Sequence, residues 1–167
     1  MGTAAAGDRV GDHDGIIPRA CVDLFRTIAE KCDGNAKVEM SYLEIYNEEI
    51  RDLLGSGKEE DKKKLKVHET LNGEVYVSNL TAKSVVDTGE IGKFMDAASG
   101  KRMVAATAMN ATSSRSHAIC TLQISGVISN EDEAKEVDKF TSKLTLVDLA
   151  GELFTKVGIC NMHNYQE

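Results

Sequence analysis

The residues best suited to chemistry are Asp148 and Gly151, which follow an apolar run in the order Asp-Leu-Ala-Gly. In nucleotide triphosphatases, an Asp at the end of a buried strand holds magnesium, often through water. A Gly three positions later lets a backbone N–H approach a terminal phosphate, because no Cβ intervenes. The same short pattern also occurs in ordinary turns, so by itself it leaves both interpretations open.

A second segment, Asn110-Ala111-Thr112-Ser113-Ser114-Arg115-Ser116-His117, is dense in polar groups. Serine hydroxyls ligate magnesium or orient an attacking water. An arginine pairs with a carboxylate or meets a phosphate through two hydrogen bonds. The alternative is a plain Ser-rich loop, and the presence of Asp148 further along the chain favours a nucleotide site over it.

A third segment, Gly55-Ser56-Gly57-Lys58, imitates a phosphate-binding loop but does not meet its requirements. The pattern G-x-x-x-x-G-K-[ST] needs a Gly where Asp52 stands and a Ser or Thr where Glu59 stands. It also needs a strand before it and a helix after it, and this segment lies in a charged stretch. We therefore interpret it as a decoy.

Composition excludes several classes of protein. The 167 residues carry a net charge of −7, which argues against a general nucleic-acid binder. No apolar run reaches the roughly 18 residues that cross a bilayer, and the first residues have no secretory signal, so we expect no membrane insertion. The four cysteines and four histidines are scattered, which favours free buried thiols in a reducing cytosol over a zinc site.

The elements that must position these residues can be placed by periodicity. A Gly-rich tail precedes a helix with apolar residues at helical spacing. Next come a β-branched strand, a short helical turn capped by Asn47, and a strand pair around Asn72-Gly73, a hairpin signal. The predicted ranges are 1–14 for the tail, 18–32 for the helix, 38–46 for the strand, 48–54 for the turn, and 65–69 with 75–80 for the pair.

The second half of the chain predicts one more helix and two strands. Asp87 and Glu90 have capping-box spacing, and a helix follows them with Ile91, Phe94, Met95 and Ala98 on one face. Residues 118–125 alternate as a half-buried strand, residues 129–139 form a charged loop, and 144–147 is typical of a central strand. The order of elements implies an α/β fold with a mixed sheet and helices on its faces.

At this point the sequence resembles the kinesin motor domain, a P-loop NTPase fold. NATSSRSH (110–117) matches the switch I pattern N-x-x-S-S-R-S-H, and SKLTLVDLAG (142–151) looks like the strand and start of switch II. VEMSYLEIYNEEIRDLL (38–54) and GIIPRACVDLF (15–25) are similar to two further family segments. The resemblance covers residues 15–151, with unmatched tails at 1–14 and 152–167. Myosin shares parts of these switches, but SSRSH and IYNEEI favour kinesin.

The resemblance implies ATP and Mg²⁺ as ligands and microtubules as partner. Ser113 and Ser114 would lie near magnesium and the attacking water, Asn110 would order the loop, and Arg115 would form one side of a salt-bridge gate. Asp148 would hold the magnesium shell and Gly151 would sense the terminal phosphate. Ser113 and Asp148 are therefore the expected metal residues, Asp148 through water. His117 is expected to support the loop and the next strand.

Two departures from the family pattern accompany the resemblance. No phosphate loop precedes residue 15, and Glu152-Leu153 stand where the family has Ser-Glu, so the gate carboxylate is replaced by Leu153. The expectation is a partial motor, from a truncated gene model or a short isoform, of marginal stability and inactive alone. The alternative is an inactive pseudo-motor that binds tubulin or a partner. A GTPase-like switch protein is disfavoured because no N-K-x-D motif occurs. The expected location is the cytoplasmic cytoskeleton, and dimerisation would use regions outside the chain.

Overall fold

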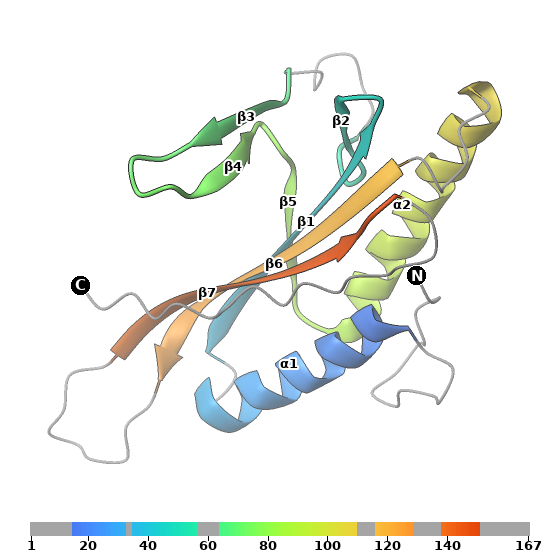
Figure 1. The fold of residues 1–167 in the computed structure, drawn as a ribbon. Coiled ribbons are helices and arrows are strands. Elements are labelled where there is room, and N and C mark those ends of the chain that lie inside the picture. The colour runs from blue at the N-terminus through green and yellow to red at the C-terminus, as the bar shows by residue number, and fades with distance from the viewer. Residues whose placement is uncertain (1–14, 33–34, 57–63, 110–115, 129–137, 151–167) are drawn as a thin grey trace, which may run out of the picture.

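The computed structural model describes residues 15–32, 35–56, 64–109, 116–128 and 138–150. This part of the chain forms two helices and seven strands (Figure 1). In order they are α1 (Ile16–Cys32), β1 (Ala36–Tyr46), β2 (Glu49–Asp52), β3 (Lys66–Glu69), β4 (Val75–Ser78), β5 (Ala82–Val85), α2 (Thr88–Met109), β6 (Ser116–Ile128) and β7 (Asp138–Asp148).

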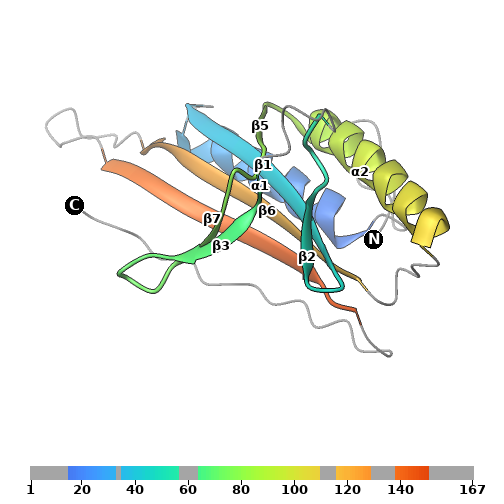
Figure 2. The same ribbon diagram turned by 90° about the horizontal axis from the view of Figure 1, so that it is seen from above.

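One five-stranded sheet organises the molecule, in the order β2-β1-β6-β7 with β5 also paired to β1. All pairings among the described strands are antiparallel. Strands β2 and β5 share one edge of β1, since β2 pairs with its second half and β5 with its first half. Helices α1 and α2 lie on the same face of the sheet, and the separate β3–β4 ribbon projects away from it (Figures 1 and 2).

The core lies between that sheet face and the two helices. Alternate residues of β6 are buried, which confirms the predicted strand and shows which of its faces meets the helices. The predicted apolar helix faces are also confirmed. Residues buried in this core include Cys21, Ile28 and Cys32 of α1, Ile91, Met95 and Ala98 of α2, Met40 and Tyr42 of β1, and Cys120 and Leu122 of β6.

Local signals fix where both helices begin. Helix α1 begins at Ile16, earlier than the predicted residue 18, because Pro18 sits within the first turn, where no N–H is required. Arg19 makes the first helical bond, to the Gly15 carbonyl. At α2 the N-cap half of the predicted capping box is confirmed, since the Glu90 N–H donates to Asp87 Oδ1 at 2.7 Å. The return bond differs, because Glu90 Oε2 accepts from the Val86 N–H and not from the Asp87 N–H.

The predicted helical turn over 48–54 is wrong. Asn47 and Glu48 instead form a tight turn with φ values of 49° and 63°, and residues Glu49–Asp52 return along β1 as β2. Two successive residues with positive φ suit the two-residue hairpin turn, and asparagine tolerates that conformation well. Pairing of Ile45 with Ile50 outweighs the capping preference of Asn47.

The other strand predictions fare better. The hairpin around Asn72-Gly73 is confirmed as β3–β4, with Gly73 at a φ of 81°. Strand β7 is longer than predicted and begins at Asp138, inside the expected loop. We expected it to be a central strand, but among the described strands it pairs with β6 alone and ends the sheet. Among its side chains from residue 139 onwards, only Leu146 is buried, and the others are partly buried or exposed.

The Asp52 carboxylate joins the segments on either side of the ribbon. It accepts the N–H groups of Leu54 and Gly55 at 2.8 and 2.9 Å, and that of Thr81 at 2.8 Å. Lys101 Nζ of α2 donates to the carbonyl oxygen of Gly55. The residues just before and just after the segment that contains β3 and β4 are therefore held together beside α2.

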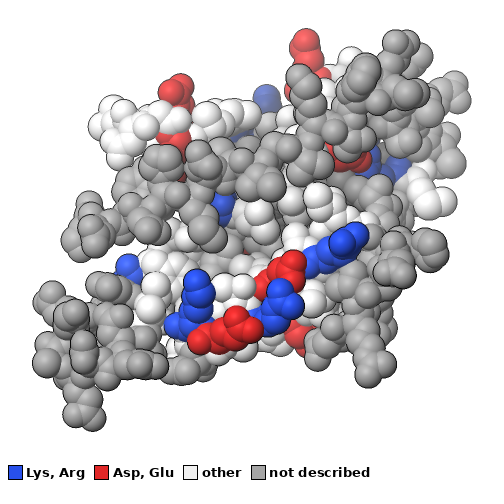
Figure 3. Space-filling view, turned by 60° about the horizontal axis from the view of Figure 1, so that its bottom comes forward, with Lys and Arg blue, Asp and Glu red and all other residues white. Residues whose placement is uncertain are grey.

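The outward face of α1 carries charges of both signs. Arg26 pairs with Asp23 at 2.6 Å, with about two thirds of each side chain exposed (64% and 66%). Figure 3 shows positive and negative side chains side by side along this face. Such a surface provides no single-sign field for a polyanion such as nucleic acid.

No helix among the described residues is long and apolar enough to cross a membrane.

The cysteines that the structure describes are free and buried, as the sequence predicted: Cys21, Cys32 and Cys120. Cys160 lies outside the described residues. Burial raises the pKa of the Cys21 thiol to about 11 and that of Cys120 to about 12. These thiols are protonated core residues and poor nucleophiles at neutral pH.

Two glycines give a matched test of the packing. A Cβ on Gly126 would lie 2.9 Å from the Ala36 Cβ and 3.0 Å from the Asn35 carbonyl oxygen, whereas nothing lies within 4 Å of one on Gly100. We expect Gly126→Ala to lower the free energy of unfolding by about 1–3 kcal/mol. Gly100→Ala, within α2, should raise it by about 0.5–1 kcal/mol. Urea unfolding followed by circular dichroism measures both, and equal effects would contradict the close β1–β6 approach.

Alkaline pH should destabilise the fold. The pKa values of Cys21 and Cys120 rise from 9.0 to about 11 and about 12, so folding favours the protonated thiols. Their contribution to stability is complete below about pH 9 and is lost as pH rises towards 12. Thiols of the unfolded chain ionise at about pH 8.5–10.5. Over this pH range, the free energy of unfolding should fall less in Cys120→Ala than in the wild type. Parallel pH curves for the two proteins would contradict it.

Candidate functional site

Asp148, the residue singled out first from the sequence, is the last residue of β7. It lies opposite Ala118 of β6, which lies opposite Glu44 of β1, which in turn lies opposite Arg51 of β2. Directly opposed residues of an antiparallel sheet share a face, so these four form one row across the sheet. Strands are about 4.8 Å apart, which places Glu44 and Asp148 about 10 Å from each other with a small Ala between them.

Glu44 is the buried charge of this row, with only 5% of its surface exposed. Its Oε1 accepts a hydrogen bond from Arg102 Nε of α2 at 3.1 Å. Its Oε2 lies 3.8 Å from Arg51 Nη1. A buried carboxylate requires such compensation, because desolvation of an unpaired charge costs several kcal/mol.

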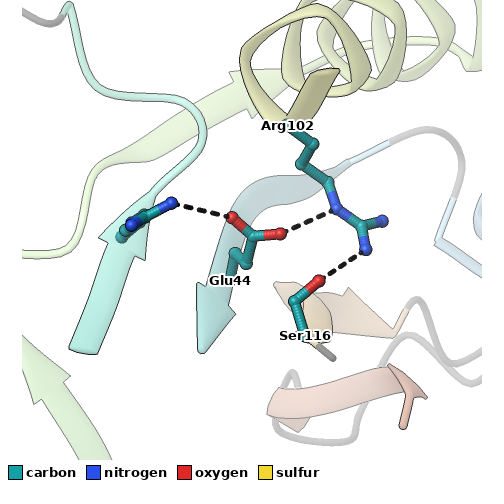
Figure 4. A network of polar contacts seen from close by, with 4 residues as sticks. Glu44, Arg102 and Ser116 are labelled. Atoms are coloured by element: carbon teal, nitrogen blue, oxygen red, sulfur yellow. Dashed lines mark hydrogen bonds and ion pairs between the residues drawn. The ribbon is translucent and has the colours of Figure 1, made fainter. Parts of the chain in front are cut away.

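Arg102 continues the network to the first residue of β6. Its Nη2 donates to Ser116 Oγ at 3.1 Å, and Ser116 is itself buried at 5% exposure. Figure 4 shows the chain of contacts from Glu44 through Arg102 to Ser116. Arg102 belongs to the helix that precedes residues 110–115, and Ser116 directly follows them. The guanidinium therefore links the two elements that bracket the candidate switch I segment.

Tyr42 lies on the same strand as Glu44 and interacts with Arg102. Burial raises the pKa of its phenol to about 12, and the charge and hydrogen bond of Arg102 partly oppose the rise. Cys120 and Asp148 contribute smaller upward effects. The phenol is therefore a neutral hydrogen-bonding group on the helix-facing side of β1, within the electrostatic reach of both Arg102 and Asp148.

His117 joins the segment after Asp148 to β6. Its Nδ1 accepts a hydrogen bond from the Ala150 N–H at 2.9 Å. Of the residues proposed from the sequence, Asp148 and His117 are described, and Asn110, Ser113, Ser114, Arg115 and Gly151 lie outside the described residues. The structure gives the positions of Asp148 and His117, and the roles of all seven residues remain predictions.

Sequence reasoning missed the Glu44–Arg102–Ser116 network. A charged residue at an inward position of an otherwise apolar strand was an available signal for Glu44. Nothing in the spacing of α2 marked Arg102, because its partners are far away in the sequence. The interpretation of Gly55-Ser56-Gly57-Lys58 as a decoy gains support, since the amides of Leu54 and Gly55 already donate to the Asp52 carboxylate.

The described residues fit one side of a magnesium–nucleotide site. The Asp148 carboxylate is an oxygen ligand of the type that magnesium prefers, directly or through water. No group of three or more metal-binding side chains occurs within the described ranges. The phosphate-binding loop pattern does not occur in the 167 residues.

Comparison with known proteins identifies the family of this site. The model of the family described as kinesin motor domain matches residues 3–158. The chain is 40% identical over 163 residues to kinesin-related protein 5 of Dictyostelium discoideum. It is 41% identical over 148 residues to kinesin-like protein KIN-7L of Oryza sativa subsp. japonica. It is 40% identical over 157 residues to chromosome-associated kinesin KIF4 of Mus musculus.

The matched regions cover most of this chain but little of its relatives. The three alignments include 95%, 88% and 90% of the chain and 16%, 22% and 12% of the respective relatives. The chain also resembles a solved structure titled "Structure of a fast kinesin: Implications for ATPase mechanism and interactions with microtubules". That similarity has a TM-score of 0.70 at 35% identity and covers 90% of this chain and 40% of the other.

Removal of Arg102 should be far more costly than removal of an exposed arginine. Arg102→Met leaves the Glu44 carboxylate buried without its hydrogen-bonded cation, and we expect a loss of about 3 kcal/mol in unfolding free energy. Arg26→Met removes a surface ion pair and should cost less than about 0.5 kcal/mol.

Glu44→Gln in the Arg102→Met background tests the cause. Because it removes a buried charge that then has only Arg51 nearby, at 3.8 Å, the double variant should recover at least about 1 kcal/mol over Arg102→Met alone. Urea unfolding of the wild type, Glu44→Gln, Arg102→Met and the double variant measures the coupling energy between the two side chains. Additive effects of the two substitutions would show that the ion pair is not what holds α2 to β1.

Proposed function

The chain belongs to the kinesin motor domain family, and we propose that it is part of an ATP-dependent microtubule motor that does not turn over ATP by itself. The observation that carries this proposal is the position of Asp148 at the end of β7, in the sheet row stabilised by Glu44 and Arg102. This arrangement supplies a rigid platform for one carboxylate of a magnesium–ATP site. The chain spans about a fifth or less of its curated relatives (16%, 22% and 12%).

The proposed roles follow the family resemblance at matching positions. Asp148 holds the magnesium shell through water, and Ser113 joins the same shell. Ser114 would act near the attacking water, Asn110 would help to order the loop near the nucleotide, Arg115 would form the switch I side of the salt-bridge gate, and Gly151 would sense the terminal phosphate. Bound magnesium would neutralise phosphate charge during hydrolysis. The Arg102–Ser116 hydrogen bond supports this proposal because it anchors the residue that follows switch I.

Inactivity of the chain alone is proposed on the basis of the missing phosphate loop. The backbone N–H cradle and the lysine of that loop supply most of the phosphate binding in related enzymes. Leu153 at the expected position of the gate carboxylate removes the natural partner of Arg115 as well. The proposed location is on the microtubule cytoskeleton in the cytoplasm, where a parent motor would act.

The decisive experiment measures ATP hydrolysis by the purified chain with and without microtubules. We expect no turnover above background under either condition, for the wild type and for Asp148→Ala alike. Turnover that microtubules stimulate and that Asp148→Ala abolishes would overturn the proposed inactivity and would establish the Asp148 site.

A second function, a nucleotide-independent tubulin-binding module, is favoured by one observation. The β3–β4 ribbon exposes Val67, Leu71, Val75 and Tyr76, with Leu71 fully exposed at 107%, and exposed apolar clusters of this kind mark interaction surfaces. Co-sedimentation with microtubules, with and without nucleotide, separates the two functions. Pelleting in both conditions supports the binding module, and absence of pelleting in both removes it.

A further inference from the structure

A side chain extends the pairing of β6 and β7 beyond the end of the sheet. The backbone ladder ends where Asp148 lies opposite Ala118. Two residues later, the Ala150 N–H donates to Nδ1 of His117, at 2.9 Å. The neighbours of His117 in β6, Ser116 and Ala118, are buried on the helix-facing side, so His117 projects from the opposite face. The imidazole thus replaces a backbone acceptor at the point where β7 stops.

The ladder holds Asp148 itself, and the His117 bond holds the peptide group between Leu149 and Ala150. Together they fix the backbone at Asp148 and just after it. On the β6 side, the residue next to His117 is Ser116, whose hydroxyl is held by Arg102. A displacement of the chain at Ser116 therefore moves His117, and the Ala150 N–H must follow or lose its acceptor.

We propose that His117 is a positioning residue that couples the backbone after residues 110–115 to the backbone after Asp148 through its Nδ1 bond to the Ala150 N–H. This inference rests on the proposed function, because the coupling has a functional consequence only if the two segments are the switches. The bond requires an imidazole whose Nδ1 carries no proton, so the neutral ring holds its hydrogen on Nε2. The coupling is a property of the chain itself and needs no nucleotide to be observed.

Two substitutions at the same position separate the acceptor from the ring. In His117→Asn the side-chain oxygen can occupy the place of Nδ1 and accept the same bond, whereas His117→Leu fills similar space without an acceptor. We expect the Ala150 amide, followed by NMR hydrogen exchange, to exchange at least 10-fold (about one hydrogen bond's worth) faster in His117→Leu. His117→Asn should stay within about threefold of the wild type, with the β6–β7 ladder amides as internal reference.

The coupling itself is tested by a change on the other side of the bond. Ser116→Ala removes the hydroxyl that Arg102 holds, and it should accelerate Ala150 exchange in the wild-type background. In the His117→Leu background, the same substitution should cause no further change at Ala150. Equal effects of Ser116→Ala in the two backgrounds would overturn the coupling, as would unchanged Ala150 exchange in His117→Leu.

A measurement on the unmodified chain covers the case in which a variant fails to fold. Long-range ¹H–¹⁵N spectra of the unmodified chain should show His117 with its proton on Nε2. A proton on Nδ1 would overturn the proposal. Because these experiments contain neither ATP nor microtubules, their failure would leave the proposed function standing. Conversely, ATP turnover by the chain would overturn its proposed inactivity without touching the His117 bond.

Discussion

The pairing of the Glu44 carboxylate with Arg102 is the constraint on which the site depends. Glu44 is buried in the middle of the sheet row that ends at Asp148, so its charge must be matched there. The match comes from α2, and it fixes that helix over β1 at a defined height. Without it, apolar packing of α2 and the hydrogen bond from Arg102 to Ser116 would remain, but Arg102 would no longer be held to Glu44 of β1.

The same guanidinium has a second function, since it also holds Ser116. The segment 110–115 thus connects two elements that a single side chain already joins. The hydrogen bond from the Ala150 N–H to His117 then connects β6 to the residues that follow β7. Glu44, Arg102, Ser116, His117 and Ala150 therefore form a polar path from the centre of the sheet to the residue two positions after Asp148. The other buried residues that the structure describes are hydrophobic.

Several parts of this arrangement were predictable because they depend on local sequence. The capping box at Asp87 and Glu90, the turn at Gly73 and the alternation of β6 are each decided within a few residues. The turn after Asn47 was mispredicted because a local capping preference competed with cross-strand pairing to β1. The Glu44–Arg102 contact was missed since its partners lie 58 positions apart, and no local pattern specifies such a distance.

The sequence by itself determined the family and the chemical identity of the candidate switch residues, because motif letters and spacing are properties of the chain. It also determined the apolar faces of both helices, because periodicity shows which side must be buried. Only the tertiary structure decided which charges meet. The register of three strands set Glu44 and Asp148 in one row, and the placement of α2 brought Arg102 to both Glu44 and Ser116. Those contacts depend on how separate elements pack, which spacing along one chain does not encode.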